Sequence, residues 1–185
     1  FEAFVDSGFD CLVAYPNGII HRKLARLAFE YLGDPFQPFV FGQLCYPMHM
    51  AVLHKVPLVF YGENAELYYG GDASSANKPC WDSSEWDRVY LKGIGIGRLL
   101  SIGMEVGALN EKDIRELSTF YHLPNKTDMD PAVEGSPQFH WFSYYRDWAP
   151  QSNFYHAAEH TGFQTNSGRS EGTYSKFASL DDQLD

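Results

Sequence analysis

The sequence predicts an α/β fold in which a parallel sheet is flanked by helices. Two short apolar runs, residues 9–15 and 57–61, each end at a turn that contains glycine, and a helical pattern lies between them. Neither run alternates polar and apolar residues, which is typical of strands covered by helices on both faces. The order strand, helix, strand is the order that gives parallel strands. Ligands bind at the carboxyl ends of such strands, so the turns after Tyr15 and Tyr61 are candidate positions.

Three helices are predicted from the spacing of apolar residues and from end signals. The first covers residues 21–33 and stops at Gly33, the second covers about 46–55, and the third covers 111–121 after an Asn110 cap. The side chains expected to face inward are Leu24, Leu27, Ala28 and Tyr31 in the first helix, Met48, Ala51 and Val52 in the second, and Ile114, Leu117 and Tyr121 in the third. Loops are expected at 34–42, 70–92, 93–97 and 124–135.

Composition narrows the classes of partner. The chain has 14 basic and 24 acidic side chains and a net charge of −10, which repels phosphate backbones, so no nucleic acid partner is expected. Three widely spaced cysteines, Cys11, Cys45 and Cys80, give no disulfide framework and fit a reducing compartment. No apolar run approaches the length of a membrane span. We therefore expect a cytoplasmic protein without a membrane span.

The strongest chemical signal follows the second apolar run. Gly62 would let a ligand approach the backbone closely, and Glu63, Asn64 and Glu66 come directly after it. The two glutamates are hard oxygen ligands that suit Mg²⁺ beside a triphosphate. The alternative interpretation is a solvated loop after an edge strand.

This element resembles the strand-GHNxDD element of the PP-loop ATP pyrophosphatases. Longer blocks are similar to the N-acetyl sugar amidotransferases of lipopolysaccharide O-antigen and flagellin-sugar biosynthesis: AYPNGIIHRKLARLAFEYLGDPFQPF at 14–39, FGQLCYPMHMAVLHKVPLVFYGENAELYYGG at 41–71, and NFYHAAEHTGFQTNSGRSEGTYSKFASLDDQLD at 153–185. Together the blocks cover most of the chain. The resemblance implies an adenine-nucleotide α-hydrolase-like fold with an aromatic-rich C-terminal helical extension.

The resemblance also implies an activity. ATP adenylates the N-acetyl group of a UDP-linked sugar, and ammonia from a glutaminase partner then replaces AMP to leave an acetamidino group. With ATP and Mg²⁺ as cofactors, the implied catalytic residues are Glu63, Asn64, Glu66 and Lys176. The implied nucleotide-binding residues are Gly62, Arg22, Lys23, Arg169, Tyr174 and Ser175, and the implied metal ligands are Glu63, Glu66, Asp181 and Asp182.

Simpler interpretations of the same residues stay open. Cations that begin a helix oppose its dipole, so Arg22 and Lys23 either reach for an anion or form a solvated basic turn. The segment from Arg169 to Asp182 can equally be an exposed loop before a short acidic helix. Aromatic side chains could stack on uracil or a sugar ring, or belong to a core or interface; they are Tyr144, Tyr145, Trp148 and Tyr155.

The chain departs from the family at the phosphate-binding loop. No Ser-Gly-Gly-x-Asp-Ser element occurs in these residues, so the resemblance places it before Phe1. Residues 1–75 would then be part of the ATP-binding α/β domain and 76–185 a helical and loop-rich substrate region, and the segment alone is expected to be inactive. Two alternatives remain: a non-catalytic nucleotide-sugar binding or assembly subunit, and a tRNA-thiolation or lysidine-type enzyme, which the charge and the lack of CxxC disfavour.

Three other patterns predict no site. A dinucleotide motif from Gly93 would need glycine at position 98, where Arg98 stands. Cys45 and His49 have a metal-ligand spacing, but without a second pair nearby a buried cysteine and a partly exposed histidine are expected. No GxSxG elbow supports a hydrolase triad.

Overall fold

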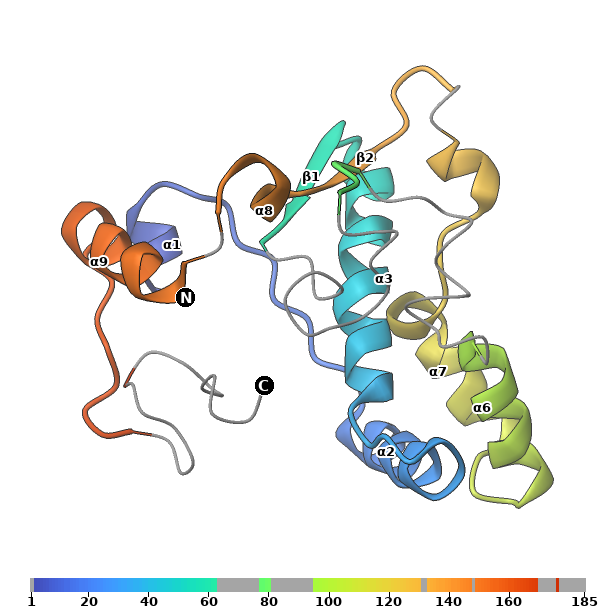
Figure 1. Cartoon of the computed structure of the whole chain (residues 1–185). Helices are drawn as coiled ribbons and strands as arrows, with labels where there is room; N and C mark the ends of the chain where they lie inside the picture. The colour runs from blue at the N-terminus through green and yellow to red at the C-terminus, as the bar shows by residue number, and fades with distance from the viewer. Residues whose placement is uncertain are drawn as a thin grey trace.

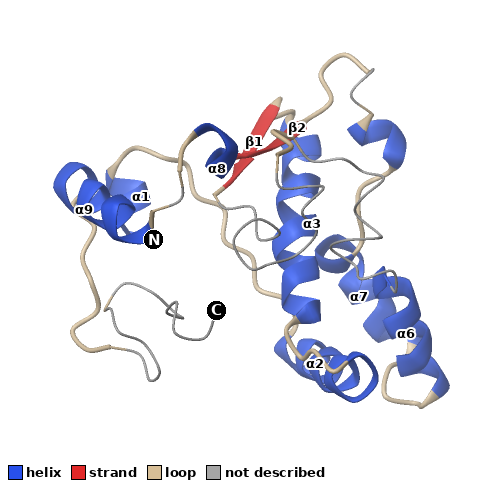
Figure 2. Cartoon of the chain, in the orientation of Figure 1, coloured by secondary structure: helices blue, strands red, loops and turns tan. Residues whose placement is uncertain are grey.

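The computed structural model describes residues 2–62, 77–80, 95–130, 133–147, 149–169 and 176. These residues form a mixed α/β structure that is mostly helical and contains a two-stranded parallel sheet (Figures 1 and 2). The elements are α1 (Glu2–Asp6), α2 (Gly18–Leu32), α3 (Gln37–His54), β1 (Leu58–Tyr61), α6 (Gly95–Glu105), α7 (Glu111–Tyr121), a 3₁₀ helix (Lys126–Met129), β2 (Gln138–Trp141), α8 (Phe142–Tyr145) and α9 (Pro150–Thr161). No helix in these ranges is long and apolar enough to span a membrane.

Helix α2 forms where the sequence predicts a helix, but it begins at Gly18, three residues before the predicted start, and it has a cap at each end. The Asn17 side chain accepts hydrogen bonds from the backbone N–H groups of Ile19 and Ile20, and Gly33 ends the helix in the left-handed region at φ 74°. Leu24, Leu27 and Ala28 are buried together with Ile20. The prediction for Tyr31 is wrong, because this residue lies at the edge of the buried face and is half exposed.

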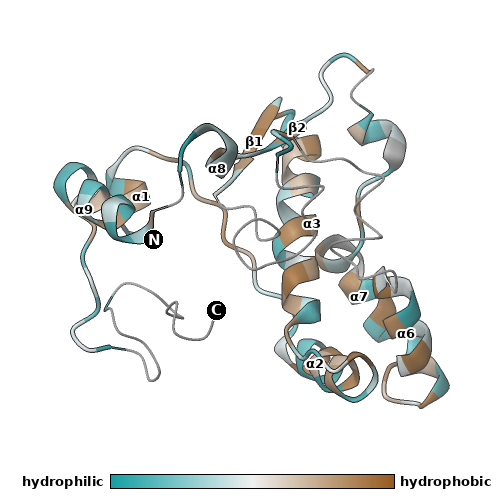
Figure 3. Ribbon diagram, viewed as in Figure 1, coloured by the Kyte–Doolittle hydropathy of each residue, from teal (hydrophilic) through white to brown (hydrophobic). Residues whose placement is uncertain are grey.

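Helix α3 is longer than predicted and lies at the centre of the fold. It begins at Gln37, so the expected loop at 34–42 is wrong for most of its length. Pro38 lies in the first turn, where a backbone N–H would have no acceptor within the helix, so the proline removes no hydrogen bond. The helix continues through Pro47. Figure 1 shows α2, α7 and β1 grouped around this helix, and Figure 3 shows apolar residues along it. Its buried residues are Gln37, Pro38, Phe41, Leu44, Cys45, Met48 and Ala51.

The sheet pairs β1 with β2 in parallel, in the register Leu58↔Gln138 to Tyr61↔Trp141. The strand at 57–61 is therefore confirmed, but its burial on both faces is not. Val59, Tyr61, Phe139 and Trp141 face the core, whereas Leu58 and Phe60 on the other face are nearly half exposed. Strand β2 is not among the strands that the sequence predicts.

The predicted strand at residues 9–15 is absent. This segment has no regular secondary structure, and Leu12, Val13 and Tyr15 are exposed. The physical reason is the lack of a neighbour: β1 and β2 pair with each other, and no strand in the described ranges pairs with residues 9–15. An extended segment gains no ladder hydrogen bonds without such a neighbour.

The predicted helix at 111–121 is confirmed as α7, whereas helix α6 was not predicted. Asn110 caps α7 by accepting from the N–H groups of Lys112 and Asp113, and Leu117 and Tyr121 are buried on its inner face. Helix α6 begins at Gly95, so the turn expected at 93–97 is wrong for Gly95 to Gly97. The loop expected at 124–135 holds one 3₁₀ turn and is otherwise irregular where it is described.

Two glycines of α6 give a matched test of this packing. A Cβ on Gly103 would lie 2.5 Å from Leu109 Cδ1 and 3.0 Å from Leu27 Cδ1, so Gly103→Ala should lower the free energy of unfolding by about 1–3 kcal/mol. A Cβ on Gly97 meets nothing within 4 Å, so Gly97→Ala should raise it by up to about 1 kcal/mol. Urea unfolding followed by circular dichroism measures both. Equal effects would contradict this packing of α6.

Candidate functional site

The carboxyl end of β1 is held firmly in place. The Tyr61 hydroxyl donates to the Leu44 carbonyl of α3 at 2.9 Å, and the Ser143 N–H of α8 donates to the Gly62 carbonyl at 3.0 Å. Burial raises the pKa of Tyr61, so this hydroxyl stays a donor at neutral pH. Glu63, Asn64 and Glu66 lie outside the described residues. The structure thus fixes the point from which the predicted acidic element leaves the sheet.

Of the predicted cations at the start of α2, Lys23 has a partner inside the chain. Its Nζ lies 3.0 Å from Asp113 Oδ2 on α7, and the same carboxylate oxygen accepts the Asn110 N–H at 3.2 Å. The hydrogen bond from Lys23 is the main cause that lowers the pKa of Asp113. Arg22 is exposed and makes no ion pair with the other described residues. Lys23 therefore joins two helices, whatever else it binds.

The predicted C-terminal residues are described only in part. Arg169 and Lys176 are exposed, and the Asn166 N–H donates to the Lys176 carbonyl at 3.1 Å. Tyr174, Ser175, Asp181 and Asp182 lie outside the described residues. Their proposed contacts with phosphate and metal stay predictions.

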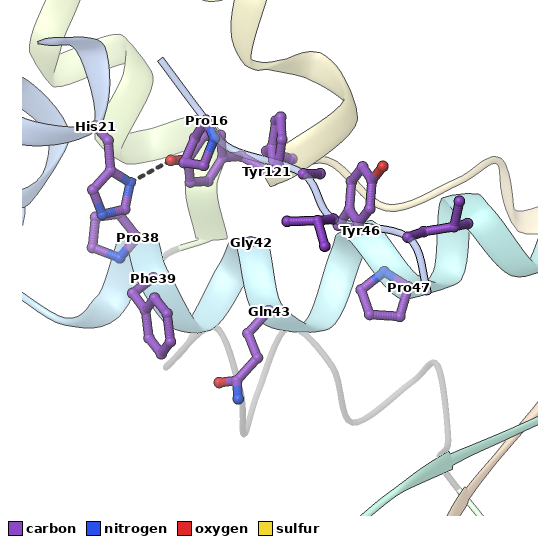
Figure 4. Close-up of a pocket in the computed structure, with 13 residues that line it drawn as sticks. Pro16, His21, Pro38, Phe39, Gly42, Gln43, Tyr46, Pro47 and Tyr121 are labelled. Carbon is purple, nitrogen blue, oxygen red and sulfur yellow. Dashed lines mark hydrogen bonds between the residues drawn. The ribbon is translucent and has the colours of Figure 1, made fainter. Parts of the chain in front are cut away.

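A groove that the sequence analysis missed lies beside the other candidate position, the turn after Tyr15. It has a volume of about 360 Å³ and runs between residues 12–16, helix α3 and the end of α7 (Figure 4). None of its lining side chains is an acid, a lysine or an arginine. They are Leu12, Val13, Ala14, Pro16, His21, Pro38, Phe39, Gly42, Gln43, Tyr46, Pro47, Phe120 and Tyr121. The Pro- and Phe-rich stretch at 34–42, for which the sequence predicts a loop, is the signal that could have indicated this groove.

The polar groups of this groove are neutral. Figure 4 shows the hydrogen bond between His21 Nδ1 and the Tyr121 hydroxyl. Burial lowers the pKa of His21 and raises the pKa of Tyr121 to about 12, so neither carries a charge at pH 7. Tyr46 and Phe120 stack with ring centroids 5.0 Å apart. Aromatic walls with a few uncharged polar groups suit a flat, uncharged chemical group.

A second aromatic group lies on the exposed face of the sheet. Phe60 contacts His140, Phe142 and Tyr145 with ring centroids 5.7–6.1 Å apart, and His140 Nδ1 is 2.7 Å from the Tyr145 hydroxyl. Tyr145 and its neighbour Tyr144 are about half exposed, so they are not core residues. Tyr155 on α9 is also exposed, and Trp148 is outside the described residues.

Cys45 and His49 have the states that the sequence predicts. Cys45 is buried, and burial raises the pKa of its thiol to about 12. His49 is half-buried, and its Nε2 lies 2.7 Å from the His122 carbonyl. The part of the chain that the structure describes contains no group of three or more side chains placed to hold a metal ion. All three cysteines are free.

The contact between Lys23 and Asp113 predicts a pH dependence. Because the pKa of Asp113 is lower in the folded chain than its unfolded value of about 3.9, its contribution is present above that pH and lost as pH falls through the folded pKa. Asp113→Asn should therefore lower the free energy of unfolding near pH 7, by up to about 1 kcal/mol for such a surface pair, and much less near pH 2.

Urea unfolding across this pH range measures the difference. Glu111→Gln is the control, because Glu111 is exposed and its partner Arg115 lies 3.8 Å away. If Asp113→Asn lowers the free energy of unfolding by the same amount at every pH, the ion pair between Lys23 and Asp113 does not contribute as proposed.

Comparison with known proteins assigns no family: no protein-family model matches the chain, and no curated protein matches it.

Proposed function

We propose that the chain belongs to a cytoplasmic, ATP-dependent N-acetyl sugar amidotransferase of the PP-loop ATP pyrophosphatase superfamily. The proposal rests on the sequence blocks at 14–39, 41–71 and 153–185. One structural observation carries it further: β1 is a parallel strand that ends at Tyr61, and Gly62 leads directly into Glu63-Asn64-Ala65-Glu66. The carboxyl end of a parallel strand is where α/β folds bind their ligands.

The setting of this strand end supports a nucleotide site. A residue that stabilises the charge developing on a phosphate group during the reaction must be held in position beforehand. The hydrogen bonds from Tyr61 to α3 and from Ser143 to Gly62 fix the end of β1 in this way. Glycine at position 62 leaves the backbone accessible because it has no Cβ. The groove beside Pro16 has no described strand end next to it, but its uncharged, aromatic lining suits the uncharged part of a nucleotide.

In this proposal the N-acetyl oxygen attacks the α-phosphorus of ATP, and pyrophosphate leaves. Ammonia from a glutaminase partner then attacks the activated carbon, and AMP departs with the former amide oxygen to leave an acetamidino group on a UDP-linked sugar. Glu63, Glu66, Asp181 and Asp182 would hold Mg²⁺, which neutralises charge on the phosphates.

The other proposed residues bind and orient the substrates. Asn64 would bind ATP beside the two glutamates. Arg22, Lys23, Arg169 and Lys176 would contact phosphate or the nucleotide sugar, with Tyr174 and Ser175 beside them. Because Lys23 already pairs with Asp113, a phosphate contact would share or replace that ion pair.

The test is ATP–pyrophosphate exchange by the protein that carries these residues together with a phosphate-binding loop. Glu63→Ala should reduce exchange about 100-fold or more, the size of effect seen when one stabilising group is removed from a preorganised charged site. Glu134→Ala is the matched control, because Glu134 is an exposed carboxylate in the 133–147 segment, and it should leave exchange unchanged.

Two results would contradict the proposal. Equal exchange by wild type and Glu63→Ala would remove Glu63 from the site. Nucleotide-sugar binding without any AMP formation, in the presence of ammonia and ATP, would favour a non-catalytic binding subunit instead.

A further inference from the structure

Helix α9 carries two histidines on the same face, one helical turn apart. His156 and His160 are four positions apart in the sequence, and their ring centroids are only 4.3 Å apart, with an angle of 49° between the ring planes. Both side chains are exposed. Side chains at i and i+4 lie above one another on a helix, so this closeness follows directly from the spacing.

Solvent can reach both imidazoles. The His156 side chain makes no hydrogen bond with another residue in the described ranges. His160 Nε2 lies 3.8 Å from Glu159 Oε2, which is too long for a hydrogen bond, and both side chains are more than half exposed. The ring nitrogens of both residues are therefore open to a ligand from solvent.

A second pair with the same spacing shows what makes α9 different. Cys45 and His49 on α3 are also four residues apart, but Cys45 is buried and keeps its proton, because its pKa is raised to about 12. His49 places its Nε2 against the His122 carbonyl. The i, i+4 spacing alone is thus insufficient to make a metal site. Of these two pairs, the α9 pair combines this spacing with two exposed imidazoles.

We propose that His156 and His160 form a two-ligand site for a divalent transition metal ion, with water in the remaining coordination positions. Imidazole suits Zn²⁺, Ni²⁺ and Cu²⁺, whereas Mg²⁺ prefers oxygen ligands. Two histidines at i and i+4 on one helix face are a known way to hold such an ion. The net charge of −10 also raises the local concentration of cations. This site is independent of the proposed amidotransferase activity.

The test is titration of the untagged protein with NiSO₄, ZnCl₂ or CuSO₄ in an isothermal calorimeter. Because the second imidazole binds intramolecularly once the first has bound, His156→Ala and His160→Ala should each lower the affinity about tenfold or more. Affinity should rise from Zn²⁺ or Ni²⁺ to Cu²⁺. MgCl₂ should give no heat from this site. Helix α9 has no buried residues, so these variants leave the core intact, and circular dichroism checks that they fold.

Two control variants separate the pair from histidine content. His54→Ala removes one exposed histidine at the end of α3 and should leave the affinity unchanged. The double variant His160→Ala, Thr161→His keeps seven histidines but moves the second imidazole about 140° around the helix from the first. It should bind as weakly as His160→Ala. Wild-type affinity in His156→Ala or in the double variant, or an equal loss in His54→Ala, would overturn the proposal.

Discussion

Helix α3 is buried among its neighbours, and this burial sets the positions of the elements packed around it. Phe41, Cys45, Met48 and Ala51 are almost fully enclosed, and the helix contacts α2, α7 and β1. Close packing of this kind transmits small displacements, because a well-filled core has no free volume to absorb them. A shift of α3 would therefore move the sheet and both neighbouring helices together.

Polar contacts tie the candidate sites to this core. The Leu44 carbonyl of α3 accepts the Tyr61 hydroxyl and so sets the end of β1. Helices α2 and α7 are joined twice, by His21 with Tyr121 and by Lys23 with Asp113. The groove beside Pro16 borders α3 and the first of these contacts, whereas α9 lies away from the core and contacts α1. The neutral groove and the end of β1 thus share one rigid support, and the histidine pair does not.

Local signals predicted helices well where caps and periodicity agree. Gly33 at the end of α2 and Asn110 at the start of α7 were predicted, because each end signal acts within one turn of the chain. The Asn17 cap of α2 was not predicted. The start of α3 was not predicted because prolines there indicated a loop. Helix α6 was not predicted because its glycines indicated a turn, whereas Gly103 is required by its close contact with Leu109. Strands were harder to predict, because residues 9–15 are apolar but lack a partner, and only tertiary pairing reveals β2. The groove was missed for a similar reason, since it joins side chains as far apart as Pro16 and Tyr121.

In the proposed site, the end of β1 presents Glu63 and Glu66 to the metal-bound phosphates of a nucleotide. An experimental structure of the protein with a non-hydrolysable ATP analogue and Mg²⁺ tests it directly. We expect a triphosphate at the carboxyl end of β1, with at least one of these carboxylates within bonding distance of the metal or of its bound water. A triphosphate bound elsewhere, with both carboxylates turned to solvent, would contradict it.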